Sequence, residues 1–389
     1  MATLSVSSET AVVEVVRAAR ETRRTLEIVG HGTKRGFGRP LECDDVLDLS
    51  GLTGIVTYES DEMIITARAG TSVAEIEAAL AEHNQRLGFG PPDWSSLLYA
   101  YNKSATIGGV LSANANGSAA VRYGRCRDHL LGFRAVNGFG EAYKGGGKVV
   151  KNVTGFDLPK LFCGAMGTLG PLTEVTLRVF PIPPLSVVFE IEALTFPQAA
   201  PLLHRLWTSA LEPTCLAYVP AVAAQELGLA ENAILVRLEG SAAHQKEQNK
   251  ILRELAGRHN VAENEDGNAI IKALGDGMPF HCNSLGVRRV AIAPSQAAAF
   301  VAELDPPMWF ADWAGGLLWV GVKGNTASIH DLAARYHAYA VQIRPDDHAA
   351  ASELPFPPEP PVRAELTKRV KAAFDPLRLF NPGRMWEGV

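Results

Sequence analysis

A short apolar run followed by four closely spaced glycines places the strongest constraint on how this chain can fold. The run IVGHGTKRGFGRP, residues 28–40, contains Gly30, Gly32, Gly36 and Gly38. Glycine tolerates positive φ angles and leaves space beside the main chain, so that successive N–H groups can converge on an anion. Thr33 and Lys34 would add side-chain donors to such a concavity. Taken alone, the run is equally compatible with a turn that binds nothing.

Two familiar nucleotide-binding motifs do not fit this run. A Rossmann fold requires the spacing G-x-G-x-x-G between a strand and a helix, whereas Pro40 and a further strand pattern follow here. A P-loop requires Gly-Lys and then Ser or Thr at the start of a helix. The order here is Gly32, Thr33, Lys34, and the later run GGGKVV continues into valines. Neither Rossmann-type nicotinamide binding nor nucleoside-triphosphate hydrolysis is therefore predicted.

Two further glycine-rich segments favour a bound diphosphate over an empty turn. The second segment, ATIGGVLSANANGSAAVRYG, predicts another close approach of the main chain at Thr106, Gly108 and Gly109. The third segment, GGGKVVKNVTGFDLPKLFCGAMGTLG, contains Thr154 and Gly155 and then Gly164, Gly167 and Gly170 at a spacing of three. Close packing of a helix on a strand remains an alternative explanation for that triplet.

Composition and charge exclude several classes of protein. The 389 residues and the formal net charge of −5 suit a globular chain of two or more domains and provide no field that attracts nucleic acid. The five cysteines are scattered and form no CxxC pair, so neither a disulfide framework nor a metal cluster is predicted. The sequence shows no signal-peptide core and no window near the roughly 18 apolar residues of a membrane span. We expect a cytoplasmic protein that partner subunits could attach to a membrane.

Changes in residue pattern divide the chain into three parts. Residues 1–184 combine a helix, several short strands and the glycine segments, and they end at the proline cluster PIPP. Residues 185–350 alternate strand and helix patterns, which predicts an open antiparallel sheet with helices on one face. Residues 351–389 begin with a proline-rich linker and continue as a helix and a tail. The expected fold class is α+β.

In their order along the chain, the three glycine segments resemble the FAD-binding segments of the vanillyl-alcohol-oxidase superfamily. The tail FDPLRLFNPGRM resembles the C-terminal DP…NPG motif of the same superfamily. The sequence KVVKNVTGFDL and the short C-terminal half are most similar to the FAD-binding E subunits of bacterial glycolate oxidases. This resemblance implies a two-subdomain FAD-binding domain of the p-cresol-methylhydroxylase (PCMH) type, a smaller α+β domain, and a tail that returns to the FAD-binding domain. It identifies the glycine run as a phosphate loop.

The resemblance also implies which residues contact the cofactor. Backbone amides between the two subdomains would hold the diphosphate. The matching positions are Gly30, His31, Gly32, Thr33 and Lys34 on the first loop, Thr106, Gly108, Gly109 and Ser112 on the second, and Gly117, Thr154, Gly155, Gly167 and Gly170 on segments that line the rest of the cofactor.

Three features depart from the family pattern. His31 stands where glycine is common, so its side chain points away from the diphosphate or donates to it, and a solvent-facing ring is a further alternative. Thr33 occupies a position where some members attach the flavin covalently through histidine, so the expected FAD is non-covalent. Ala165 and Met166 replace polar residues of the usual GSEGTLG pattern, which removes a polar contact.

Few residues of the C-terminal half indicate a substrate site. Members that act alone carry metal- and substrate-binding histidines in an HxxGDGNxH pattern. The nearest string here, Asp266-Gly267-Asn268, has no flanking histidine at a useful spacing, and we interpret it as a turn. Weak catalytic candidates are His281 as a base and Arg288 or Arg289 as carboxylate anchors, although each has a structural alternative. No metal site is predicted.

Two functions remain open. The first is an FAD-binding subunit of a glycolate-oxidase-like complex, in which a sister FAD-containing catalytic subunit oxidises glycolate or a related 2-hydroxy acid and an iron–sulfur subunit takes the electrons. The second is a self-sufficient FAD-dependent 2-hydroxy-acid dehydrogenase that uses His281 and an arginine. The lack of a ligand cluster after Pro184 favours the first function.

Overall fold

A computed structural model describes residues 1–389 except 102, 148–155, 193–194, 324–326 and 347–353. The chain divides into two compact units. The first contains Met1–Ala115, Gly124–Ile182 and Pro358–Val389, and the second contains Asn116–Tyr123 and Pro183–Pro357. The change of unit after Ile182 lies beside the expected boundary at residue 184. No pattern in the sequence predicted that residues 116–123 belong to the second unit.

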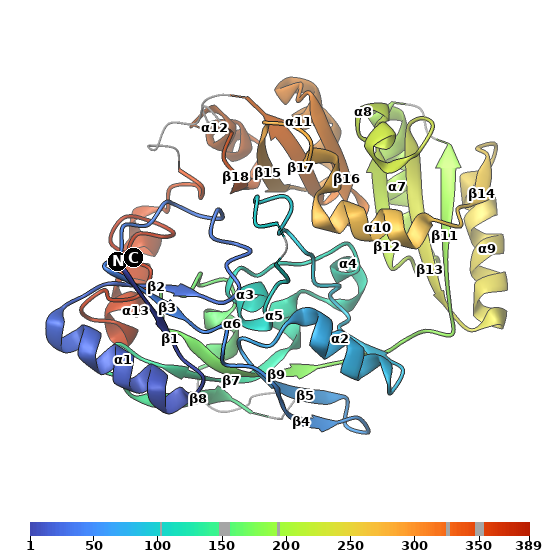
Figure 1. Cartoon of the computed structure of the whole chain (residues 1–389). Helices are drawn as coiled ribbons and strands as arrows, with labels where there is room; N and C mark the ends of the chain where they lie inside the picture. Colours follow the sequence, from blue (N-terminus) through green and yellow to red (C-terminus); the bar gives the residue numbers. More distant parts are fainter. Residues whose placement is uncertain (102, 148–155, 193–194, 324–326, 347–353) are drawn as a thin grey trace. The chain divides into compact units, whose positions relative to one another are not determined.

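The first unit begins with a small parallel sheet and one connecting helix. The elements are β1 (Ala2–Ser5), α1 (Glu9–Thr22), β2 (Leu26–Val29) and β3 (Asp45–Asp48), with the strand order β1-β3-β2 (Figure 1). The helix α1 starts after Ser8, whose hydroxyl accepts a hydrogen bond from the Ala11 amide. Its buried Val12 and Val16 pack in an apolar core with residues of β2 and β3. The first glycine run leaves this sheet at the end of β2.

The second sheet of the first unit is antiparallel. Its strand order is β4 (Ile55–Glu59), β5 (Ile64–Arg68), β9 (Leu172–Arg178), β7 (Leu130–Val136) and β8 (Ala142–Gly146). The other elements of this part are α2 (Val73–Ala81), α3 (Ile107–Ser112), α5 (Cys126–His129), α6 (Leu158–Phe162), and the paired strands β6 (Gln85–Arg86) and β10 (Phe180–Pro181). The short helix α3 contains Gly108 and Gly109 of the second glycine segment, and it contacts β9.

The C-terminal residues complete the first unit. The helix α13 (Pro361–Phe374) carries Lys371, whose side chain is 1% exposed. Its Nζ donates to the Asp375 carboxylate at 2.8 Å and to the carbonyl oxygens of Thr168 and Phe380 at 2.6 and 2.9 Å. Phe380 then pairs with Leu26 in a parallel bridge, so the tail extends the small sheet beside β2. A buried ion pair and a backbone bridge therefore fix the tail.

The second unit is built on one eight-stranded antiparallel sheet. The strand order is β14 (Val261–Glu263), β11 (Leu185–Glu192), β13 (Ala233–Gly240), β12 (Cys215–Val219), β16 (Met308–Asp312), β17 (Leu317–Val322), β15 (Gly286–Ala291) and β18 (Tyr339–Arg344) (Figure 1). The antiparallel sheet and the flanking helices confirm the expected α+β class.

Helices cover the sheet of the second unit on both faces. The apolar core includes residues of α7 (Phe196–Thr208), α9 (Ala242–Ala256), α11 (Pro294–Leu304) and α12 (Ala327–Arg335). The short helix α8 (Ala221–Ala224) contacts β16, and α10 (Gly267–Asp276) contacts β11. At the start of α10, a Cβ on Gly267 would lie 2.3 Å from the side chain of Val188, whose neighbours Val187 and Phe189 face the apolar core. Since strand neighbours face opposite sides, α10 covers the second face, which differs from the expected arrangement on one face.

The string Asp266-Gly267-Asn268 begins a helix instead of forming an isolated turn. Gly267 is the first residue of α10, and the side-chain amide of Asn268 donates to the Ser186 carbonyl oxygen at 3.1 Å. None of the helices in the described part of the chain combines the length and apolar character needed to cross a membrane.

Residues 116–123 are held to the second unit by polar contacts. They include α4 (Ala120–Tyr123). The Ser118 hydroxyl donates to the Asp312 carboxylate at 2.7 Å, and the Tyr123 hydroxyl donates to Glu239 at 2.9 Å. Burial raises the pKa of Asp312, whereas the hydrogen bond from Ser118 opposes that shift. Side chains from distant strands therefore determine where this short segment lies.

Candidate cofactor site

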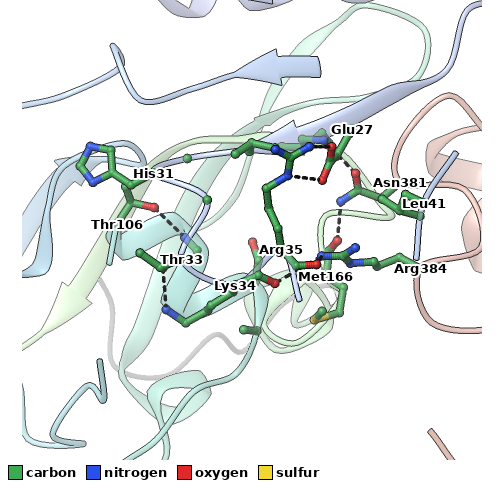
Figure 2. A pocket seen from close by; sticks show the side chains of 17 residues that line it. Glu27, His31, Thr33, Lys34, Arg35, Leu41, Thr106, Met166, Asn381 and Arg384 are labelled. Carbon is green, nitrogen blue, oxygen red and sulfur yellow. Dashed lines mark hydrogen bonds and ion pairs between the residues drawn. The ribbon is translucent and has the colours of Figure 1, made fainter. Parts of the chain in front are cut away.

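The first glycine loop follows β2 and presents several hydrogen-bond donors. Gly32 has a φ of 76°, in the left-handed region that glycine adopts without strain. The N–H groups of His31, Gly32 and Thr33 make no hydrogen bond to another main-chain group within the described residues. Thr33 is buried, and Lys34 Nζ donates to its hydroxyl at 3.4 Å (Figure 2). The loop therefore combines main-chain and side-chain donors on consecutive residues.

Two arginines hold this loop in position. Arg35 Nε donates to Glu27 Oε1 at 2.9 Å, and the same pair makes a second contact between Nη2 and Oε2. The hydrogen-bonded carboxylate of Glu27 raises the pKa of Arg35. From the C-terminal tail, Arg384 donates to the carbonyl oxygens of Lys34 at 3.3 Å and Arg35 at 2.7 Å (Figure 2). Burial lowers the pKa of Arg384, and these carbonyl oxygens supply the hydrogen bonds that a buried guanidinium requires.

The second glycine segment meets the first one directly. Thr106 precedes α3, and its hydroxyl accepts a hydrogen bond from the Gly109 amide at 3.3 Å. A Cβ atom on Gly30 would lie 2.5 Å from this hydroxyl oxygen, so the two segments touch where no side chain fits. A Cβ on Gly109 would meet only the Thr106 hydroxyl, at 3.1 Å. Gly109 therefore borders open space, whereas Gly30 borders protein.

Three other predicted glycines allow close packing. An added Cβ would lie 2.8 Å from the Ala69 carbonyl oxygen at Gly108, 2.7 Å from Asn381 Nδ2 at Gly167, and 2.4 Å from the Val136 carbonyl oxygen at Gly170. Gly167 and Gly170 also have positive φ angles, of 74° and 145°. These three glycines therefore pack closely against neighbouring segments, and they also line the cavity.

The third segment reaches the cavity at Met166. This residue is buried and has a φ of 52°, which is uncommon for a residue other than glycine. Its N–H donates to the Ser112 carbonyl oxygen at 2.9 Å. Its own carbonyl oxygen accepts a hydrogen bond from Asn381 Nδ2 at 2.7 Å (Figure 2). The C-terminal tail is therefore part of the wall that the glycine segments form.

The ring of His31 connects two segments of the site. Its Nδ1 lies 2.9 Å from the Ser104 carbonyl oxygen. Because a carbonyl oxygen only accepts, Nδ1 carries the proton in this contact. Figure 2 shows the ring turned away from Thr33 and Lys34. The geometry favours the alternative in which the side chain points away from the donors of the first loop.

The glycine segments enclose two adjoining cavities of the first unit, which share Gly30, Thr106 and Gly109. The predicted cofactor residues that line them are Gly30, His31, Gly32, Thr33, Lys34, Thr106, Gly108, Gly109, Ser112, Gly167 and Gly170. Amide N–H groups, a threonine hydroxyl and a lysine ammonium beside open space form a donor set that suits a diphosphate.

Three predicted cofactor residues do not line these cavities among the described residues. Gly117 belongs to the second unit, where its carbonyl oxygen accepts a hydrogen bond from Trp313 Nε1 at 3.2 Å. Thr154 and Gly155 lie outside the described residues.

The two arginine candidates for a carboxylate anchor lie in different environments on β15. Arg288 is fully buried, and its Nη1 donates to the carbonyl oxygen of Arg344 at 3.0 Å. This environment favours a structural role. Arg289 is partly exposed, with its guanidinium 5.4 Å from the ring centre of Trp313 and 4.9 Å from that of Trp319. A cation held over aromatic rings keeps its N–H groups at its edge, where an anion can bind.

The histidine candidate contacts the main chain. His281 Nε2 lies 3.4 Å from the Asp276 carbonyl oxygen. Among the described residues, no group of three or more His, Cys, Asp or Glu side chains is placed to hold a metal ion. The contacts of His281 and Arg289 involve different neighbours, since Arg289 also donates to the Asn116 carbonyl oxygen at 3.4 Å.

Comparisons with known proteins identify the family. Residues 2–146 match the model of a FAD binding domain. The chain is 31% identical to the glycolate oxidase subunit GlcE of Escherichia coli over 379 residues, which cover 97% of each chain. The protein belongs to the GlcE family. FAD is its cofactor, and it is a FAD-dependent oxidoreductase, as the resemblance predicted.

Two further comparisons show a relative that is similar over part of the chain and a solved structure with a similar fold. The chain is 30% identical to a D-lactate dehydrogenase of Archaeoglobus fulgidus over 45% of this chain and 38% of that protein. The solved structure of p-cresol methylhydroxylase with substrate bound superposes with a TM-score of 0.74 at 15% identity, covering 98% of this chain and 88% of that chain. This superposition confirms the expected PCMH-type fold.

Sequence reasoning missed several residues of the cavity wall, among them three that the C-terminal tail or the third segment supplies. Met166, Asn381 and Arg384 all line the first cavity, although none of them was predicted to contact the cofactor. The available signals were the departure at Met166 from the usual family pattern and the NPGR string of the tail. Neither signal indicates a direction in space, so neither could be assigned to the site before the fold was known.

Proposed function

We propose that this chain is the FAD-binding subunit of a glycolate-oxidase-like complex and takes part in oxidising glycolate or a related 2-hydroxy acid. The observation that carries this proposal is the similarity to GlcE along 97% of both chains. In this proposal a sister FAD-containing subunit oxidises the substrate and an iron–sulfur subunit receives the electrons. The proposed location is the cytoplasm, with any attachment to a membrane made through these partners.

The proposed cofactor contacts follow from the donor set of the first unit. The amides of His31, Gly32 and Thr33 would bind the diphosphate, and Lys34 would balance its charge. The open side of Gly109 would allow the main chain to approach the ligand closely. FAD, once bound, supplies the capacity to accept two electrons. The residues of this chain bind and orient it.

The proposed FAD is held without a covalent bond, because Thr33 occupies the position where covalent members carry histidine. The purified protein should be yellow, and acid precipitation should release the flavin into the supernatant. Flavin that remains in the precipitate would disprove non-covalent binding. A colourless protein that cannot be reconstituted with FAD would disprove the proposed cofactor site.

Dependence on partners is proposed because the described residues hold no group of three or more His, Cys, Asp or Glu side chains placed to bind a metal ion, and because His281, the candidate base, contacts a main-chain carbonyl oxygen. Oxidation of a hydroxy acid needs a group that takes the hydroxyl proton, and such general-base catalysis typically contributes about 10²–10⁴-fold. After anaerobic mixing of the isolated protein with glycolate or D-lactate, the flavin absorbance should stay largely oxidised. Co-expression with the partner subunits should restore the bleaching.

A second function, a self-sufficient 2-hydroxy-acid dehydrogenase, is favoured by the similarity to D-lactate dehydrogenase and by the partly exposed Arg289. In that case the isolated protein would bleach rapidly with substrate. His281→Ala would remove the base, and Arg289→Met would weaken substrate binding. Bleaching that both variants abolish would replace the first proposal with this one.

A further inference from the structure

The side chain of Asn381 joins two parts of the cofactor cavity that are far apart in the sequence. Its Oδ1 accepts a hydrogen bond from the Ile28 amide of β2 at 2.8 Å. Its Nδ2 donates to the carbonyl oxygen of Met166 at 2.7 Å. Asn381 is 4% exposed and lines both adjoining cavities. One buried amide therefore links the strand before the first glycine loop to the third segment.

Both hydrogen bonds require an amide at this position. Asparagine offers an acceptor and a donor on one planar group, whereas an aspartate carboxylate only accepts. An aspartate would place a negative charge beside the Met166 carbonyl oxygen and leave that oxygen without its donor. Asn381 also has a φ of 42°, a conformation that asparagine tolerates better than most residues.

The neighbouring glycine is shaped to receive this side chain. A Cβ on Gly167 would lie 2.7 Å from Asn381 Nδ2, so only glycine leaves room for the amide. Arg384, three positions further along the tail, donates to the carbonyl oxygens of Lys34 and Arg35. The tail thus contacts the first loop through Arg384, and through Asn381 it contacts the strand that precedes this loop.

Other contacts dock the tail independently of Asn381. Lys371 pairs with Asp375 in the interior, and Phe380 is fully buried against the small sheet. The amides of Leu379 and Phe380 both donate to the Asp375 carboxylate, at 2.9 and 2.8 Å. A substitution at Asn381 should therefore leave the tail in place, so that its effect on the cavity can be separated from its effect on the fold.

We propose that Asn381 is a positioning residue of the FAD site. It sets the separation between the end of β2 and the Met166 turn, and thereby the width of the cavity in which the cofactor lies. The C-terminal tail, which other contacts hold in place, supplies this amide to the site. The inference rests on the proposed cofactor site in the first unit.

The test compares full-length Asn381→Asp and Asn381→Ala with the matched control Phe380→Leu, which weakens tail packing without altering a cavity-lining residue. The thermal midpoint of each apoprotein is measured first. The FAD dissociation constant is then measured by flavin fluorescence, well below the lowest midpoint. We expect Asn381→Asp to weaken FAD binding at least about tenfold and Asn381→Ala to weaken it less, because two buried hydrogen bonds are lost or opposed. Phe380→Leu should keep wild-type affinity despite a lower midpoint.

Three results would overturn the inference. Unchanged FAD affinity in both Asn381 variants would show that the amide does not position the site. An equal loss of affinity in Phe380→Leu would assign the effect to general destabilisation. A wild-type protein that binds no FAD would disprove the cofactor site itself. If Asn381→Asp does not fold, Asn381→Ala and the control decide the question by the same comparison.

Discussion

The polar groups of the first glycine loop and those of the second unit differ in their hydrogen-bond partners. The amides of residues 31–33 have no main-chain partner among the described residues, and they border a cavity. In the second unit, the Ser118 hydroxyl donates to buried Asp312, and fully buried Arg288 donates to carbonyl oxygens. Donors that face a cavity are available to a ligand, whereas polar groups bonded within the protein stabilise the fold. The difference assigns cofactor binding to the first unit and a mainly structural role to these buried groups of the second.

The comparison predicts that the largest effect on cofactor binding comes from the open side of Gly109. In Gly109→Val the new side chain would project into the cavity, because an added Cβ meets only the Thr106 hydroxyl there. We expect no measurable FAD in the purified variant and, because the added Cβ would lie 3.1 Å from the Thr106 hydroxyl, a small loss of apoprotein stability. The matched control is Ala165→Ser, which should keep its flavin. Equal flavin content in wild type and Gly109→Val would show that this surface does not face the cofactor.

The next largest effect should come from the buried ion pair under the tail. Lys371→Met leaves the Asp375 carboxylate buried without its cation, a change that typically costs about 3–5 kcal/mol. Urea unfolding followed by circular dichroism, fitted with separate transitions for the two units, measures the loss. The exposed Lys368→Met on the same helix serves as a control with little expected change. If both variants unfold alike, this pair does not anchor the tail.

In the second unit, a polar contact should affect stability and leave FAD affinity intact. Ser118→Ala removes the donor to Asp312, and leaving a buried acceptor less satisfied costs about 1–3 kcal/mol. Urea unfolding should show this loss in the second unit, while FAD titration should match that of wild type. A variant of unchanged stability with weakened FAD binding would reverse the assignment of roles to the two units.

The smallest expected effect is a pH dependence that arises from Asp312. Burial raises the pKa of this carboxyl in the folded protein, so above the ordinary aspartate pKa the folded state retains a proton that the unfolded chain releases. Stability should therefore fall as the pH rises from the ordinary aspartate value to the raised one. Asp312→Asn, which does not titrate, should flatten this part of the curve. If the urea midpoints of wild type and Asp312→Asn change with pH in the same way, the pKa of Asp312 is not raised.

The roles of residues that set the main-chain conformation could be predicted from the sequence, whereas most side-chain contacts could not. Gly32 could be predicted because its conformation favours glycine whatever surrounds it. Thr106 was predicted as part of a loop where the main chain approaches a ligand closely, whereas in the structure its hydroxyl caps the short helix α3. Arg288 and Arg289 are adjacent and chemically identical, yet one is buried against carbonyl oxygens and the other lies over indole rings. Alternation along β15 separates them, but only the packed sheet shows which face each occupies.

The sequence by itself determined the α+β class, the glycine segments in their order and, through the family resemblance, the cofactor. The fold class and the glycine segments depend on local spacing and on backbone freedom, which neighbouring residues specify, whereas the cofactor was implied only by the resemblance. The tertiary structure alone decided that Gly109 borders open space while Gly108 borders the Ala69 carbonyl oxygen. It also decided that Asn381 completes the wall by bonding Ile28, 353 positions away. Such contacts depend on atoms that distant segments bring together, and no local pattern records which segments will meet.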